Sequence, residues 1–132
     1  MMKNTSYLGL TLLFLISFLP VQLWSQCQDK EVILATVTGD YSDEMSYEIF
    51  NEEEILIYKF QGTQNNFSYS DTLCLEDGCY RIESYDSFGD GWNGGYLEVK
   101  WDNESLLVEL PSGTAGFDYF GINQTGCIPA IT

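Results

Sequence analysis

Apolar and polar residues alternate with a period of two through much of this sequence, and this pattern restricts the fold more than any other feature. Met45, Tyr47 and Ile49 share one face, whereas Ser46 and Glu48 share the opposite one. Successive side chains of a β-strand point to opposite faces of a sheet, so the alternation predicts half-buried strands. Long apolar stripes with the 3.6-residue period of a helix do not follow residue 25. The pattern predicts strands at residues 31–38, 45–50, 55–60, 79–85, 96–101, 104–110 and 117–122.

The segments between these strands are short and rich in Gly, Asn and Asp, residues that favour turns. Asp102 and Asn103 separate two strands as a two-residue hairpin turn, because both residue types tolerate a positive φ. Residues 61–70 (QGTQNNFSYS) form the longest polar stretch and are expected to be an exposed loop. Short strands at this spacing predict an all-β fold, a two-sheet antiparallel β-sandwich.

The first residues have the pattern of an export signal. Lys3 precedes an apolar run over residues 8–20, which has the length of a signal-peptide core and is short for a membrane span. Ser25 supplies a small residue before the cleavage point. We therefore expect residues 1–25 to be a signal peptide and residues 26–132 to form a single secreted, extracellular domain that is not inserted in a membrane after cleavage.

All four cysteines, Cys27, Cys74, Cys79 and Cys127, follow this signal. An even number in a small exported domain indicates two disulfide bonds, and three pairings are possible. Cys74–Cys79 is favoured because the intervening Asp77-Gly78 can turn the chain back, which leaves Cys27–Cys127 to join the two ends of the domain. A metal–thiolate cluster is disfavoured, since the sequence contains no histidine and the compartment is oxidising.

The charge balance is strongly acidic, with 20 Asp and Glu against 5 Lys and Arg and a net charge of −15. Such a surface repels nucleic acid and anionic lipid and attracts cations, so a nucleic-acid partner is excluded. Aromatic residues make up 15% of the chain, which is too many for an acidic disordered tail and indicates a folded domain.

The composition also argues against an enzyme. The absence of histidine removes the usual general base of hydrolases, and paired cysteines offer no thiol nucleophile. A glycosidase needs only two carboxylates and is the remaining catalytic alternative, but a domain this small has little room for both a core and a deep cleft. We therefore expect a protein without catalytic activity.

Residues 86–95 (DSFGDGWNGG) carry the pattern with the most chemistry. Asp86, Asp90 and Asn93 are oxygen donors interleaved with glycines, and calcium takes six to eight such oxygens in flexible loops. Magnesium, which needs tight octahedral geometry, fits less well. The loop is not an EF-hand, because Phe88 and Leu97 stand at its third and twelfth positions. The alternative is a hydrogen-bonded turn in which the Asp side chains cap backbone amides without an ion.

The stretch CYRIESYDSFGDGWNGGYLEVKWD resembles a motif repeated in many secreted bacterial proteins, and GDYSDEMSYEIFNEEEILI resembles its companion half. The resemblance extends over roughly residues 32–127, nearly all of the mature chain. The domain is similar to CUB modules, two-sheet sandwiches of jelly-roll type with two disulfides, in which a Glu and two Asp residues from separate loops hold calcium. This resemblance implies that Glu44 is a third carboxylate beside Asp86 and Asp90.

Two aromatic residues of the glycine loop, Trp92 and Phe88, are candidate ligand-binding residues beside the ion. An exposed Trp would stack on a sugar ring, whereas a buried Trp92 would close the core as a lid. The sequence thus predicts a secreted adhesion or recognition module with a calcium-ordered loop that binds a glycan or an extracellular protein. The alternative is an assembly unit of an extracellular surface layer without a soluble ligand. The oligomeric state and the pairing of the cysteines stay open.

Overall fold

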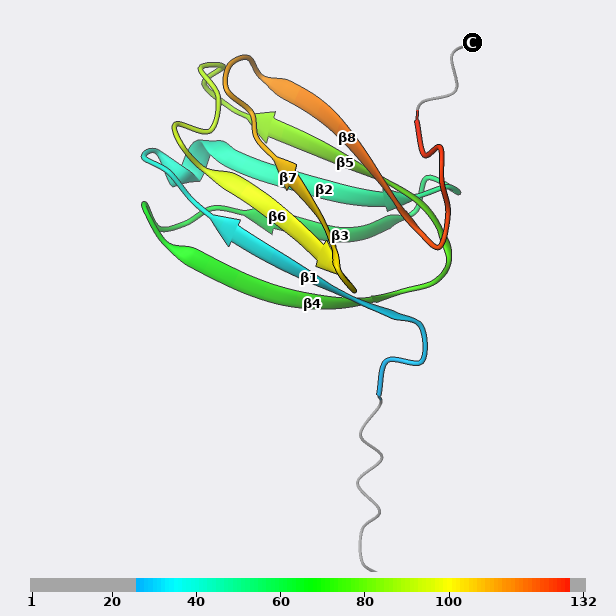
Figure 1. Cartoon of the computed structure of the whole chain (residues 1–132). Helices are drawn as coiled ribbons and strands as arrows, with labels where there is room; N and C mark the ends of the chain where they lie inside the picture. The colour runs from blue at the N-terminus through cyan, green and yellow to red at the C-terminus, as the bar shows by residue number, and fades with distance from the viewer. Residues whose placement is uncertain (1–25, 129–132) are drawn as a thin grey trace, which may run out of the picture.

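The computed structural model describes residues 26–128, which form eight β-strands in two facing layers (Figure 1). The predicted signal peptide, residues 1–25, lies outside the described residues. Within the described part, no helix has the length and apolar character that crossing a membrane requires. The strands are β1 (Lys30–Val37), β2 (Met45–Asn51), β3 (Leu56–Gln61), β4 (Ser68–Leu75), β5 (Gly78–Asp86), β6 (Tyr96–Trp101), β7 (Glu104–Val108) and β8 (Ala115–Ile122).

Both layers are four-stranded antiparallel sheets. One has the strand order β4-β1-β6-β7 and the other has the order β3-β2-β5-β8. The prediction of an all-β, two-sheet antiparallel sandwich with two disulfides is confirmed. The hairpin predicted between β6 and β7 is also present, with Trp101 opposite Glu104 and Asp102 at a φ of 50°.

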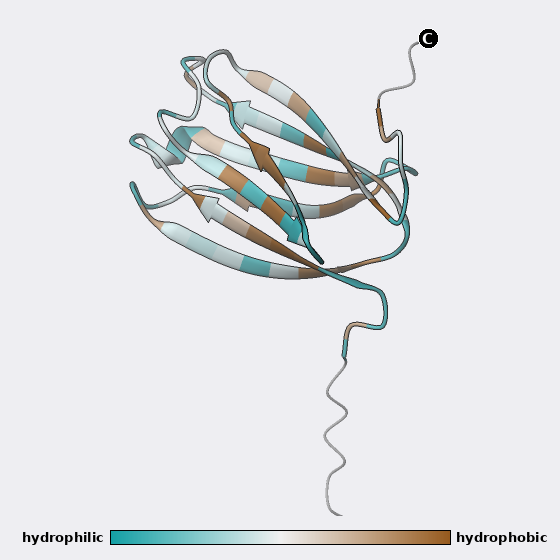
Figure 2. Ribbon diagram, viewed as in Figure 1, coloured by the Kyte–Doolittle hydropathy of each residue, from teal (hydrophilic) through white to brown (hydrophobic). Residues whose placement is uncertain are grey.

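The core lies between the sheets and follows the predicted alternation. Brown apolar positions recur along the strands in Figure 2. Met45, Tyr47 and Ile49 of β2 are at most 1% exposed, whereas Ser46 and Glu48 on the other face are half-buried. Burying such alternating side chains against a second sheet removes their apolar surface from water, and this burial is the main stabilising contribution.

The structure corrects the prediction of a loop over residues 61–70, because β4 already begins at Ser68. This strand lies at the edge of its sheet, where polar side chains remain in contact with water. Its apolar residues are sparse but point inward: Tyr69 packs against the core and Leu75 is 3% exposed. Because only one face of β4 is buried, its sequence is mostly polar, and the sequence pattern did not predict this strand.

The cysteine pairing favoured from the sequence, Cys74–Cys79 with Cys27–Cys127, is wrong. The bonds are Cys27–Cys74 and Cys79–Cys127, with Cα–Cα distances of 5.4 and 5.3 Å. The connection through Asp77-Gly78 is no hairpin turn, because β4 and β5 belong to different sheets. Cys74 and Cys79 both precede an inward-facing residue and therefore point outward on opposite sides of the sandwich.

Candidate metal centre

The loop between β5 and β6 lies at one end of the sandwich and is fixed by backbone hydrogen bonds to the β7–β8 connection. Trp92 N donates to Leu110 O at 2.7 Å, and Gly113 N donates to Gly89 O at 3.1 Å. Gly91 lies between them with a φ of 93°, and a Cβ atom there would lie 2.4 Å from Leu110 O. Glycine at this position therefore permits the close approach of two backbones.

Trp92 is buried, and this corrects its assignment as an exposed ligand-binding residue. Its side chain is 2% exposed, its ring lies 6.2 Å from that of Tyr47, and Nε1 donates to Tyr85 O at 2.8 Å. The ring closes the end of the core and satisfies its only polar atom there. Trp92 is thus the lid of the core that the sequence offered as the alternative, and no face of its ring is available to a sugar.

Asp86 holds the loop through its side chain. Its carboxylate accepts hydrogen bonds from Gly91 N at 2.6 Å, Gly89 N at 2.9 Å and Phe88 N at 3.3 Å. The residue is only 2% exposed, so these amides compensate the loss of hydration of a buried charge. Asp86 therefore performs the capping role that the sequence allowed, and its position also brings it next to the other acidic residues.

Glu44 reaches the same place from the start of strand β2. It ends a short 3-10 helix, Ser42–Glu44, and directly precedes Met45, which pairs with Asp86 across β2 and β5. Ser87 N donates to Glu44 O at 3.1 Å, which ties the two segments together. Sheet pairing therefore positions Glu44, although 42 residues of sequence separate it from Asp86.

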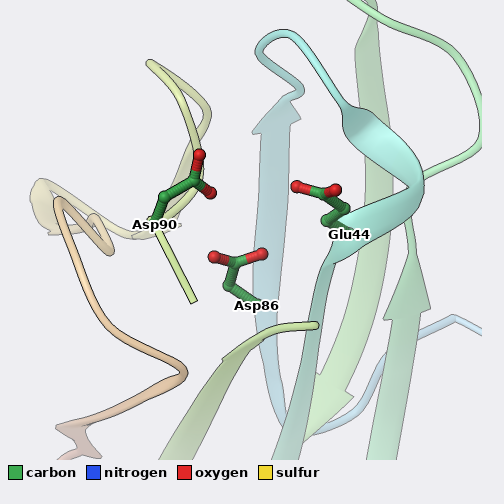
Figure 3. A group of neighbouring side chains, drawn as sticks. All are labelled: Glu44, Asp86 and Asp90. Atoms are coloured by element: carbon green, nitrogen blue, oxygen red, sulfur yellow. The ribbon is translucent and has the colours of Figure 1, made fainter. Parts of the chain in front are cut away.

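Three carboxylates meet at this end of the sandwich. One oxygen each from Glu44, Asp86 and Asp90 lie within 4.8 Å of one another, and Figure 3 shows the three groups directed toward a common space. Desolvation and the neighbouring charges of Asp90 and Asp86 raise the pKa of Glu44 above its usual range. Like charges at this separation repel, so the cluster costs free energy when it is fully ionised.

The basic residues of the described chain lie elsewhere. Among residues 26–128, each Lys and Arg pairs with a carboxylate outside the cluster: Lys30 with Asp102, Lys59 with Glu48, Arg81 with Glu54 and Glu83, and Lys100 with Glu98. No side-chain cation of this part of the chain therefore offsets the negative charge of the cluster.

The donor set fits a calcium ion. Calcium binds oxygens at about 2.3–2.6 Å, so oxygens on opposite sides of one ion lie up to about 5 Å apart. The three carboxylates satisfy this limit, and solvent can supply further ligands at the exposed Asp90. Asn93, which the sequence also predicted as a ligand, lies next to the carboxylates: its Nδ2 donates to Asp90 Oδ1 at 3.3 Å and to Gly91 O at 3.1 Å. These bonds orient Asp90.

Two exposed aromatic side chains flank the cluster. Phe88 is 76% and Tyr41 is 62% exposed, and together with Glu44 and Asp90 they line a surface depression of about 250 Å³. Tyr41 adopts a left-handed backbone conformation with φ 59° and ψ 45°, which is unfavourable for a residue with a Cβ atom. Phe88 lies beside the carboxylates, and the chain reversal before β2 brings Tyr41 to the same depression.

Comparison with protein-family models, curated proteins and solved structures finds no significant match for this chain. The geometry of the site and the chemistry of its residues therefore carry the functional argument.

Proposed function

We propose that this protein is a secreted, non-catalytic recognition module whose glycine loop is ordered by calcium and which binds a glycan or an extracellular protein beside the ion. The observation that carries the proposal is the convergence of Glu44, Asp86 and Asp90 without a neutralising side-chain cation among residues 26–128. A divalent ion converts their repulsion into binding. Two disulfides agree with an oxidising extracellular compartment.

The ion would be held by Glu44, Asp86 and Asp90, with solvent or a ligand in its remaining coordination positions. Calcium supplies a fixed positive charge that attracts hydroxyl or carboxylate oxygens of a partner. Phe88 and Tyr41 offer apolar surface next to that charge, and both are already exposed. A polar contact to the ion and an apolar contact to the rings would together orient one partner.

Thermal unfolding in calcium and in EGTA tests the ion. Calcium at 100 times its dissociation constant would add about 2.7 kcal/mol to the free energy of unfolding and raise the melting temperature by several degrees. Magnesium at the same concentration is expected to have a smaller effect, because it prefers shorter, octahedral coordination. Superimposable melting curves in calcium and EGTA would contradict the proposal.

Variants locate the effect within the cluster. Glu44→Gln and Asp90→Asn each remove one carboxylate and are expected to abolish most of the calcium-induced shift. Glu31→Gln is the matched control, since Glu31 is an exposed acid on β1 outside the cluster and should leave the shift unchanged. A shift that persists in both cluster variants would assign calcium to another part of the molecule.

Ligand binding needs a separate readout. A glycan array and capture of extracellular proteins, both in calcium, should give signals that Phe88→Ala weakens without lowering the melting temperature. Concentration-dependent self-association that persists in Phe88→Ala, without any soluble ligand, would favour the assembly unit instead.

A further inference from the structure

The outer face of the sheet β3-β2-β5-β8 carries an ordered set of aromatic and charged side chains. We call the residues Phe50, Arg81, Glu83, Phe117 and Tyr119 the aromatic face. Register places Arg81 between Phe50 of β2 and Tyr119 of β8, and it places Glu83 opposite Phe117. Residues directly opposite on neighbouring strands project from the same side of a sheet, so these groups form adjacent rows.

Arg81 is fixed at the centre of this face. Its Nη1 and Nη2 each donate to Glu54 at 2.6 Å, and its Nε donates to Glu83 Oε1 at 2.8 Å. The guanidinium also lies 5.0 Å from the centre of the Phe50 ring. A planar cation held from both ends and stacked on a ring loses little further freedom when a ligand binds.

The aromatic face is open on the side of β8. Phe117 is 59% exposed, and Tyr119 is half-buried. Two surface depressions of about 450 and 660 Å³ adjoin here and share Arg81 and Tyr119. One extends toward Phe117 and Glu83, and the other extends toward Glu54 and Ile128 beyond Cys127. Together they form one shallow groove along β5 and β8.

The charged side chains of the groove indicate which class of ligand it can bind. Arg81 is balanced by both Glu54 and Glu83, so the network has one excess negative charge and disfavours an anionic ligand. An apolar protein surface would strip water from these three charges without replacing its hydrogen bonds, which is costly. Sugar hydroxyls both donate and accept hydrogen bonds, while the less polar face of a sugar ring can pack on Phe117 and Tyr119.

We propose that the aromatic face binds a neutral polysaccharide chain, with Phe117 and Tyr119 as stacking residues and the Arg81 network as its hydrogen-bonding partner. This site lies on the outer face of a sheet and is separate from the carboxylate cluster at the end of the sandwich. Binding here is therefore independent of calcium, whether or not the proposed metal centre is correct.

Affinity electrophoresis tests the site directly. The protein is run in native gels that contain a soluble neutral polysaccharide, namely mixed-linkage β-glucan, xyloglucan, galactomannan or dextran, or the anionic polygalacturonate. Retardation by at least one neutral polysaccharide is expected, equal in calcium and in EGTA, with none by polygalacturonate. Titration calorimetry with the retarding polysaccharide then gives the dissociation constant.

Variants assign the binding to the groove. Phe117→Ala and Tyr119→Ala are each expected to weaken binding about tenfold or more, because each removes a stacking surface. Leu107→Ala is the matched control: Leu107 is 55% exposed on β7, in the other sheet, and its loss should not alter binding. Melting temperatures check that each variant is folded.

Three results would overturn the proposal. The first is no retardation by any of the four neutral polysaccharides. The second is unchanged affinity in a folded Phe117→Ala, Tyr119→Ala double variant. The third is self-association, measured by sedimentation, that Phe117→Ala abolishes; the face would then be an interface between two copies of this chain.

Discussion

At the scale of single residues, Asp86 has two roles: it caps backbone amides of the glycine loop, and it belongs to the carboxylate cluster. It is buried and negatively charged, and it accepts hydrogen bonds from three backbone amides of the glycine loop. Its oxygens also approach those of Glu44 and Asp90. The backbone amides stabilise this charge in metal-free protein, and calcium is proposed to order the loop further by joining Asp86 to Glu44 and Asp90.

Replacement of Asp86 tests this structural role. Asp86→Ala leaves the loop amides without an acceptor and is expected to lower the free energy of unfolding by about 2–4 kcal/mol in EGTA. Asp90→Ala is the control, because the exposed Asp90 accepts only a 3.3 Å bond from Asn93 and should have a much smaller effect. Urea unfolding in EGTA measures both variants. Equal stability of the two would show that the capping bonds contribute little.

Glu44 gives the metal-free protein a pH dependence of stability. Desolvation and the charges of Asp90 and Asp86 raise its pKa above the usual 4.5. The folded state therefore keeps this proton to a higher pH than the unfolded chain does. The contribution of Glu44 to stability is then most favourable at low pH and is lost as pH rises from about 4.5 through the raised pKa.

Glu44→Gln should remove the loss of stability that accompanies ionisation of Glu44 as pH rises. In EGTA, the variant is expected to gain stability relative to the wild type as pH rises from 4 to 7, and calcium should cancel the difference by stabilising only the wild type. Urea unfolding across this pH range measures the effect, with Glu31→Gln as the reference. A constant difference between variant and wild type at all pH values would show that Glu44 is not coupled to the cluster.

At the scale of elements, the disulfides join segments that the sheets bring together. Cys27–Cys74 links the chain before β1 to β4, and Cys79–Cys127 links β5 to the chain after β8. Each bond therefore reinforces an existing strand pair, β1–β4 in one sheet and β5–β8 in the other. This arrangement secures both ends of the domain without a bond between them.

Removal of either disulfide is expected to lower the free energy of unfolding by a large and similar amount. The bonds close loops with sequence separations of 47 and 48 residues. For loops of this length, the chain-entropy relation gives about 4 kcal/mol each. Urea unfolding of the double variants Cys27→Ala, Cys74→Ala and Cys79→Ala, Cys127→Ala measures the losses. Peptide mapping without reduction checks the pairing, and a peptide that joins Cys27 to Cys127 would contradict it.

At the scale of the whole molecule, the distribution of charge differs between the carboxylate cluster and the aromatic face. The described basic residues are all paired on the sheets, so the carboxylate cluster at the end of the sandwich keeps its negative charge. The aromatic face, in contrast, carries Arg81 paired with Glu54 and Glu83 beside exposed rings. We propose that the first surface binds calcium and that the second binds a neutral polysaccharide, so calcium is expected to affect binding only at the first.

The sequence by itself determined what depends on near neighbours in the chain. The period of two identified β2, β5 and β6 and the faces that they bury, because side-chain direction in a strand is a local property. Asp102-Asn103 identified a hairpin turn, because the tolerance of these residue types for a positive φ is also a local property. The glycines and acids of residues 86–95 indicated an unusual loop. The presence of two disulfides followed from the number of cysteines alone.

Only the tertiary structure decided what depends on which strands become neighbours. Cys74 and Cys79 are close in sequence, yet they lie in different sheets. Only the resemblance to CUB modules placed Glu44 beside Asp86, and the pairing of β2 with β5 is what brings the two residues together. Trp92 is buried because its ring covers the apolar end of the core, where Tyr85 O accepts a hydrogen bond from its Nε1. Sheet order arises from the packing of all strands at once, so no local pattern contains it.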